Sequence, residues 1–288
     1  MVDQAQNLRR LVGKTKEIRV ISVASGKGGV GKSTISVNLA VAMSRLGMRV
    51  LIVDADFGLA NVDVMLGVTC KYDISHFLRG ERALHEIVQQ GCEGVRFISG
   101  GSGVGDLLNI GEEQLEGLIE GIMHIDFAVD VVILDTGAGI SENIIKLVLA
   151  SSETLVVTTA EPTSILDAYA LVKTLVKSNH SHQIHVLVNK CDSKKEAQRV
   201  QDGFIEVVGR HLGKNIHPMG LIMYDHNIPQ SIKRQVPISV SAPLSETSKE
   251  IERIAKSILD IPNDNESGGL LARMFGKILS ERKEKIIK

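Results

Sequence analysis

The chain has 288 residues, of which 43% are hydrophobic and 3% aromatic, and its formal net charge is −1 at pH 7. This length fits one large α/β domain with appendages, or two small domains, and the apolar content excludes disorder throughout the chain. The near-zero charge and the scarce aromatic residues argue against a wholly basic DNA-binding surface and against base stacking. We therefore expect no specific nucleic acid as a partner.

The cysteines and the apolar runs indicate where the protein works. Cys70, Cys92 and Cys191 form no C-x-x-C pair, so neither a disulfide framework nor a zinc site is indicated. No apolar run approaches the roughly 18 residues of a membrane-spanning helix, and the polar N-terminus does not resemble a signal peptide. We expect a cytoplasmic protein whose contact with a membrane, if it has one, is peripheral.

Residues 1–14 come before the first predicted core strand. Ala5, Leu8, Leu11 and Val12 would share one side of a short helix. So short a helix is marginal on its own, and physical arguments alone favour a frayed terminus.

The next stretch predicts a strand, a glycine-rich loop and a helix. Residues 18–24 form a β-branched run typical of a buried strand, and apolar residues recur at helical spacing over Ser33–Leu46. The loop between them, Gly26 to Ser33, reads G-K-G-G-V-G-K-S and fits G-x-x-x-x-G-K-[ST] at every position. A glycine-rich turn without a ligand is the alternative, and the complete match in this context makes it improbable.

This loop pattern binds phosphate for physical reasons. Glycines let several backbone N–H groups point at one anion, and the helix N-terminus adds partial positive charge. We expect Lys32 to reach the β- and γ-phosphates and the Ser33 hydroxyl to ligate Mg²⁺. The predicted nucleotide contacts in the loop are Gly28, Gly29, Val30, Gly31, Lys32, Ser33 and Thr34.

A second strand, Arg49–Val53, ends in the acidic stretch that begins at Asp54. Ligands bind at the carboxyl ends of parallel strands, so Asp54 is placed to hold Mg²⁺ directly or through water. Asp56, two residues later, would face the same side and could orient the attacking water. The alternative is an acidic turn that binds nothing.

The following segments predict further elements of the same sheet. Residues 73–80 read as a short helix, 95–98 as a strand, and 112–125 as an amphipathic helix. The segment at Ser99–Gly103 resembles a phosphate loop in composition but lacks the G-K-[ST] ending, so it is interpreted as a flexible loop near the site. A buried strand, Val129–Leu134, then ends in Asp135, which can act on Mg²⁺ through water. The glycines after Asp135 allow that loop to move.

The last part of the domain predicts two more strand–helix units and a final pair. The strands are expected at 154–159, 184–188 and 215–222, and the helices at 162–178, 194–212 and 244–259. The strand at 184–188 ends in Asn189-Lys190-Cys191-Asp192, which fits the guanine-reading N-K-x-D element. A GTPase interpretation therefore has support, although Ala138 replaces the glycine of the usual D-x-x-G.

The C-terminal segment predicts a linker and a basic amphipathic helix. Residues 262–269 are polar and rich in glycine, and 270–288 place apolar residues on one helical face with a net side-chain charge of +4. Such a helix suits binding in the plane of an anionic membrane. Docking on its own domain would bury the same apolar residues equally well.

The spelling K-G-G-V-G-K-S resembles the deviant Walker A loop of the MinD/ParA/nitrogenase-iron-protein class of P-loop ATPases. The alternation of strands and helices predicts a doubly wound, mostly parallel α/β sheet flanked by helices, in one domain with appendages at both ends. The resemblance implies a homodimer that forms around ATP and is a monomer without it. It also implies that Lys27 reaches the nucleotide of the partner subunit and that Asp56 positions the attacking water. The implied catalytic set is Lys27, Lys32 and Asp56, and the implied metal set is Ser33, Asp54 and Asp135.

The same class places an asparagine at the end of the later strand to contact adenine, while a downstream loop closes over the base. In this sequence the base-binding residues would be Asn189, Lys190, Met223, Tyr224 and Asp225. Met223 stands where the MinD pattern usually has proline. The resemblance implies ATP, and a GTP-dependent switch through residues 189–192 stays as the alternative.

Two further stretches resemble the flagellar FlhG (YlxH, FleN) family of MinD-like ATPases. They are D-A-D-F-G-L-A-N-V-D at residues 54–63 and D-Q-A-x-x-L-R at residues 3–9. The resemblance implies a slow, dimer-activated ATPase that regulates flagellar number or placement. Its implied partners are an FlhF-type signal-recognition GTPase, a flagellar C-ring protein and an anionic membrane. Rival interpretations are division-site selection, ParA-like DNA partitioning and a nucleotide-gated scaffold with negligible turnover.

The predicted domain organisation follows from these segments. Residues 1–14 would bind the GTPase partner, and residues 15–261 would form the ATPase domain. Residues 262–269 would link that domain to a membrane-targeting helix at residues 270–288.

Overall fold

The computed structural model describes residues 18–56, 60–101, 111–123, 125 and 129–262. The N-terminal segment 1–14, the helix 270–288 and all of the linker except residue 262 lie outside this range, so their predicted roles stay predictions. In the described part of the chain, no helix combines the length and apolar character needed to cross a membrane.

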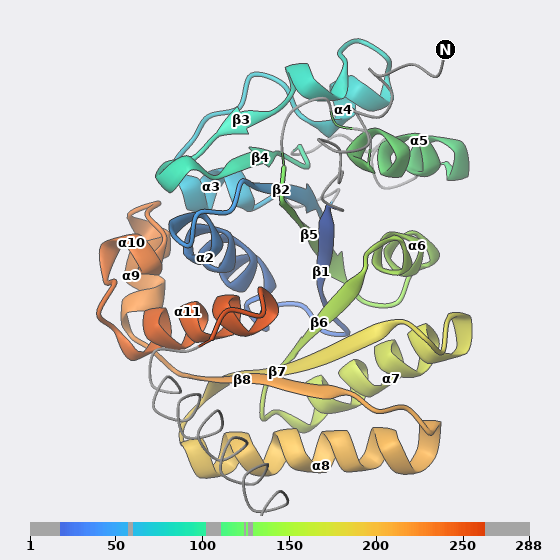
Figure 1. Cartoon of the computed structure of the whole chain (residues 1–288), viewed down its shortest axis with the longest axis vertical. Helices are drawn as coiled ribbons and strands as arrows, with labels where there is room; N and C mark the ends of the chain where they lie inside the picture. Colours follow the sequence, from blue (N-terminus) through green and yellow to red (C-terminus); the bar gives the residue numbers. More distant parts are fainter. Residues whose placement is uncertain (1–17, 57–59, 102–110, 124, 126–128, 263–288) are drawn as a thin grey trace, which may run out of the picture.

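A central, mostly parallel sheet organises the described residues (Figure 1). Its order is β3-β4-β2-β5-β1-β6-β7-β8, and every neighbouring pair is parallel except β3 with β4. The strands are β1 (Arg19–Ser25), β2 (Val50–Ala55), β3 (Gln89–Gln90), β4 (Arg96–Ile98), β5 (Val131–Ala138), β6 (Glu153–Thr158), β7 (Gln183–Cys191) and β8 (His217–Met223). The predicted doubly wound α/β fold is confirmed.

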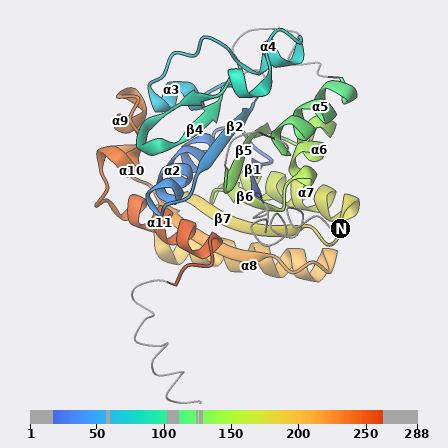
Figure 2. The same ribbon diagram turned by 45° about the horizontal axis from the view of Figure 1, so that its top comes forward.

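Helices cover both faces of the sheet (Figures 1 and 2). On one side lie α2 (Lys32–Arg45), α3 (Val62–Leu66), α9 (Asn227–Lys233), α10 (Ile238–Ser241) and α11 (Glu246–Ile258). On the other lie α4 (Ile74–Leu78), α5 (Glu112–Met123), α6 (Glu142–Ala150), α7 (Pro162–Ser178) and α8 (Lys194–Leu212). Two short 3₁₀ turns, η1 (Leu84–Glu86) and η2 (Cys92–Gly94), flank β3.

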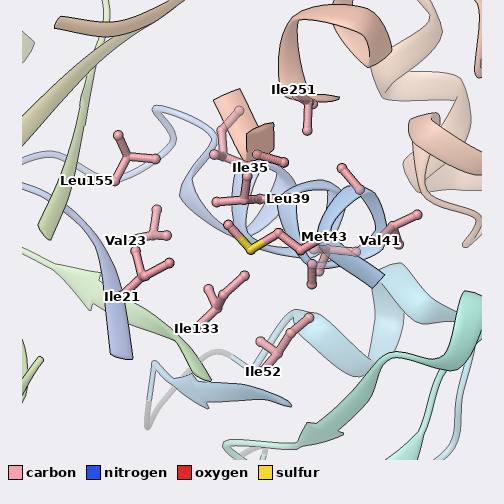
Figure 3. Packing of buried hydrophobic residues seen from close by; sticks show 14 of the residues in the cluster. Ile21, Val23, Ile35, Leu39, Val41, Met43, Ile52, Ile133, Leu155 and Ile251 are labelled. Atoms are coloured by element: carbon pink, nitrogen blue, oxygen red, sulfur yellow. The ribbon is translucent and has the colours of Figure 1, made fainter. Parts of the chain in front are cut away.

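The core forms because strand side chains alternate between the two faces. Ile21 and Val23 of β1 pack beneath α2, whereas Val20 packs in the cluster on the opposite face. Ile35 and Leu39 of α2 lie over the strands, with Ile251 of α11 above them (Figure 3). Both faces of β1 are covered, which explains its nearly unbroken apolar sequence.

Several elements around the site have no signature in the sequence patterns. The patterns do not predict α3, α6 or α9, and they place the start of the last helix at Leu244, whereas α11 begins at Glu246. The seven-residue helix α9 contains Pro229 and has no clear apolar period, so it resembles a loop in sequence. The loop after β4 was expected near the site, and Gly100 does pack against the main-chain oxygen of Asp54.

Candidate functional site

The glycine-rich loop turns sharply between β1 and α2. Gly29 and Gly31 have φ values of 76° and 97°, in the left-handed region that favours glycine. Gly26 lies so close to the main chain of Asp167 in α7 that a Cβ atom would overlap with it. Gly31 precedes α2, and no side chain caps the helix, so its first-turn N–H groups are available to an anion.

Lys32 is the first residue of α2 and is buried at the foot of the loop. Its side chain is 8% exposed, and its Nζ atom donates a hydrogen bond to Ser25 Oγ at 3.0 Å. Burial lowers the pKa of Lys32, while the nearby carboxylates of Asp135 and Asp56 act in the opposite direction. The loop therefore contains a poorly solvated amine next to acidic groups.

The predicted carboxylates meet at the carboxyl ends of two neighbouring strands. Asp54 of β2 is paired in register with Asp135 of β5, and both are fully buried. The Asp54 carboxylate accepts backbone N–H bonds from Asp56, Asn61 and Val62 at 3.2, 2.9 and 3.1 Å. Asp54 therefore ties the start of α3 to the sheet, within the stretch 54–63 that resembles the FlhG family.

The next carboxylate, Asp56, follows β2 and lies beside the end of β5. A Cβ atom added to Gly137, the next-to-last residue of β5, would contact Asp56 Oδ1 at 3.5 Å. This location, near Lys32 of the phosphate loop and the end of β5, suits a group that positions an attacking water.

The donor set fits Mg²⁺. Carboxylate and hydroxyl oxygens are the ligands that this ion prefers, and Asp135 Oδ2 is a buried acceptor without a partner among the described residues. The described chain contains no group of three His, Cys, Asp or Glu residues that could hold a metal. Mg²⁺ commonly binds through one or two carboxylates together with substrate phosphates, so Ser33, Asp54 and Asp135 are suitable candidates.

The buried carboxyls of Asp54 and Asp135 determine how the stability of the nucleotide-free protein should change with pH. Burial raises the pKa of both Asp54 and Asp135, so the folded state binds more protons than the unfolded state from about pH 4 to about pH 8. Stability must then fall as the pH rises through this window. Because Asp135→Asn removes a buried charge, it should raise the free energy of unfolding at pH 8 by about 1–3 kcal/mol.

Chemical denaturation at pH 5 and pH 8 without metal or nucleotide measures this effect. The gain from Asp135→Asn should shrink at pH 5, where the wild-type carboxyl is largely protonated. Asp192→Asn, at an exposed position, serves as the control and should change neither value. A destabilised Asp135→Asn protein at pH 8 would show that the charge is compensated in the native state.

A cavity of about 340 Å³ lies beside the phosphate loop. Six predicted residues line it: Gly31, Thr34, Lys190, Met223, Tyr224 and Asp225. The missed helix α9 supplies the rest of the lining, Ile228, Pro229, Ile232 and Lys233. An apolar wall with a few polar groups suits a nucleotide base.

Asn189 and Lys190 connect the end of β7 to the phosphate loop. Asn189 Nδ2 donates to the main-chain oxygen of Val30 at 2.8 Å, and Lys190 Nζ donates to that of Gly29 at 2.7 Å. Asn189 Oδ1 is buried and has no partner within the described chain. Asp192, which would pair with guanine in a GTPase, is exposed and does not line the cavity.

Lys27 is held at the start of α7 in the single chain. Its Nζ atom donates to Glu161 Oε2 at 2.6 Å and to Thr163 Oγ1 at 2.9 Å. Both partners lie in the sequence more than 130 positions away, so spacing could not identify them. Both side chains are partly exposed, so this ion pair lies on the surface.

The chain matches a family model described as the CobQ/CobB/MinD/ParA nucleotide binding domain over residues 21–238. It is 36% identical to the antiactivator FleN of Pseudomonas aeruginosa over 247 residues, which cover 86% of this chain and 88% of FleN. It is 34% identical to the flagellum site-determining protein YlxH of Helicobacter pylori over 241 residues, which cover 82% and 80% of the two chains.

Among solved structures, the septum site-determining protein MinD of Pyrococcus horikoshii, complexed with Mg-ADP, superposes with a TM-score of 0.69. That match has 23% identity and covers 84% of this chain and 96% of the MinD chain. This structural match supports the fold alone. The family model and the similarity to FleN and YlxH show the family to which the chain belongs. On this basis the chain belongs to the CobQ/CobB/MinD/ParA family of nucleotide-binding proteins.

Proposed function

We propose that the protein is a Mg²⁺-dependent ATPase that forms a homodimer around ATP. The observation that carries this proposal is the convergence of a complete phosphate loop, buried carboxylates on two neighbouring strands and a base-sized cavity at one end of the sheet. Family membership supports nucleotide binding. The loop sequence also contains Lys27, which by resemblance reaches the nucleotide of the partner subunit. This second lysine supports a dimer rather than an isolated domain.

In this proposal, each described residue has a limited task. The loop N–H groups and Lys32 would bind the β- and γ-phosphates, and Ser33 and Asp135, with Asp54 acting directly or through water, would hold Mg²⁺, which neutralises phosphate charge when bound. Asp54 keeps the start of α3 in place, and Asp56 orients the attacking water. Loss of the γ-phosphate would release the contacts around Asp56 and the glycine-containing segment after Asp135, and the dimer would separate.

The choice of ATP over GTP rests on Asn189, which lies against Gly31 in the wall of the cavity. Asn189 is oriented by its bond to Val30, which leaves Oδ1 as an acceptor suited to an exocyclic amino group such as that of adenine. Asp192, which would pair with guanine, is exposed rather than buried beside the phosphate loop as Asn189 is. We expect ATP to compete with a fluorescent ATP analogue at least tenfold better than GTP does, a difference of about 1.4 kcal/mol.

The competition should be run with purified protein and Mg²⁺, and turnover of both nucleotides should be measured in the same preparation. Asp192→Ala is a useful companion variant, since it should not alter the preference for ATP. Tighter binding of GTP that is lost in Asp192→Ala would instead establish the GTP-dependent switch.

We further propose that this switch regulates flagellar number or placement at the inner face of the cell membrane. FleN and YlxH, which the chain matches over most of its length, support the flagellar role, as does the D-Q-A-x-x-L-R stretch at residues 3–9. Residues 1–14 would stimulate an FlhF-type GTPase, and the dimer would deliver a C-ring component. Two basic helices at residues 270–288 would bind an anionic membrane better than one, through effective concentration.

Deletion of residues 1–14 tests the partner assignment. The truncated protein should no longer retain an FlhF-type GTPase from the same organism in a pull-down, while its ATP binding should be unchanged. Deletion of residues 270–288 is the matched control, because it removes the opposite terminus and should leave this interaction intact. Equal retention by the full-length and truncated proteins would favour a division-site role of the MinD kind.

A further inference from the structure

Ser36 forms a buried contact with Asp135 that the motifs do not predict. It lies in α2 one turn after Lys32, and its hydroxyl donates to Asp135 Oδ1 on β5 at 2.9 Å. Both residues have 0% exposure. The bond therefore joins the phosphate-loop helix to the acidic strand in a place that solvent cannot reach.

The Ser36 hydroxyl does not donate to the main chain of its own helix. A buried hydroxyl inside a helix usually satisfies itself by donating to the carbonyl four residues earlier. Thr174 in α7 does so, with a bond of 3.0 Å to the Ala170 oxygen. Ser36 instead donates its hydrogen bond to the Asp135 carboxylate on β5, which is a different element.

The contact leaves the two oxygens of Asp135 in different states. Oδ1 accepts the bond from Ser36, whereas Oδ2 is buried and has no hydrogen-bond partner among the described residues. A buried carboxylate oxygen without a partner is costly, and it is common where a ligand completes the site. The bond from Ser36 restrains rotation of the carboxylate and so gives Oδ2 a defined direction. The Ser33 hydroxyl is also close to this carboxylate and, like Ser36, lowers its pKa.

We propose that Ser36 is a positioning residue for the metal: it fixes the Asp135 carboxylate so that Oδ2 faces the hydrated Mg²⁺ of the bound nucleotide. The proposal rests on the nucleotide site described above and extends it by one residue. Ser36 itself touches neither the ion nor the phosphates. Its role parallels the outer partners of metal ligands, whose removal typically weakens metal affinity about 10- to 100-fold.

The test separates metal affinity from nucleotide affinity. Binding of a fluorescent ATP analogue is titrated with Mg²⁺, and then measured again in EDTA. Ser36→Ala should raise the Mg²⁺ concentration needed for half-maximal binding by at least about tenfold, with little change in EDTA. Ser36→Thr keeps the hydroxyl and should restore most of the Mg²⁺ response.

Two controls keep the outcome interpretable. Ser22 is as buried as Ser36, and its hydroxyl bonds to Ser151 and Thr154, so Ser22→Ala removes a comparable group outside the site. In an Asp135→Asn background, Ser36→Ala should have no further effect on the Mg²⁺ response.

The proposal is overturned if Ser36→Ala leaves the Mg²⁺ midpoint unchanged, or if Ser22→Ala shifts it equally. It is also overturned if Ser36→Ala weakens binding in EDTA as much as in Mg²⁺. Failure of the wild-type protein to bind the analogue at all would instead refute the nucleotide site. If Ser36→Ala does not fold, Ser36→Thr and Ser36→Cys provide the test, with a graded loss of the Mg²⁺ response expected from threonine to the weaker thiol donor.

Discussion

Replacing Lys27 with alanine should leave ATP binding by a single chain nearly unchanged while weakening ATP-dependent dimerisation at least 100-fold, or about 2.7 kcal/mol. The reason is that Lys32 and the loop N–H groups bind the nucleotide within one chain, whereas Lys27 would reach across to the phosphates of the other. A two-fold dimer loses this contact twice. Turnover should fall in parallel, because hydrolysis depends on the assembled pair.

Sedimentation with a non-hydrolysable ATP analogue measures the dimer, and Glu161→Gln supplies the matched control. Glu161 accepts a hydrogen bond of 2.6 Å from the Lys27 ammonium of the same chain. This contact lowers the pKa of the Glu161 carboxyl below its usual value. The exposed pair adds little to stability, so Glu161→Gln should fold normally and dimerise as well as the wild type or better. Equal loss of dimer in both variants would show that Lys27 acts only inside its own chain.

The second large effect is expected at Asp56. Because Asp56 lies against Gly137 at the end of β5 and close enough to influence Lys32, it can orient a water near the γ-phosphate. Asp56→Ala should lower the rate of ATP hydrolysis about 10²- to 10⁴-fold, the range of a positioned acid–base group. ATP binding should persist, since the phosphate loop is intact.

Single-turnover kinetics with radiolabelled ATP would separate the chemical step from product release. Asp202→Ala, on the exposed surface of α8, controls for the loss of a carboxylate and should hydrolyse ATP at the wild-type rate. A protein that loses ATP binding together with hydrolysis would place Asp56 among the groups that hold the nucleotide.

Sequence patterns predicted the sheet and the phosphate loop well, for a physical reason. Buried parallel strands require continuous apolar runs, and the loop requires glycines at positions of positive φ such as Gly29 and Gly31. Both requirements are local, so they leave a signature within a few residues. The prediction of Asp54 and Asp135 at one edge of the sheet follows from the same rule about strand ends.

The remaining features depend on contacts between distant segments. Helix α9 completes the base cavity, yet its seven residues include Pro229 and carry no amphipathic period. The Ser36–Asp135 bond spans 99 positions and depends on how α2 sits on the sheet. The pairing of Lys27 with Glu161 likewise depends on the close approach of the loop to α7, which Gly26 permits.

In the proposed switch, ATP holds two copies of the chain together. The mass of Asp56→Ala in solution, measured by light scattering with saturating ATP and Mg²⁺, reports this directly. We expect a particle of twice the 31.2 kDa chain mass, which returns to the single-chain mass when Lys27→Ala is added. A single-chain mass for Asp56→Ala with ATP demonstrably bound would contradict it and leave a nucleotide-binding domain without a dimer switch.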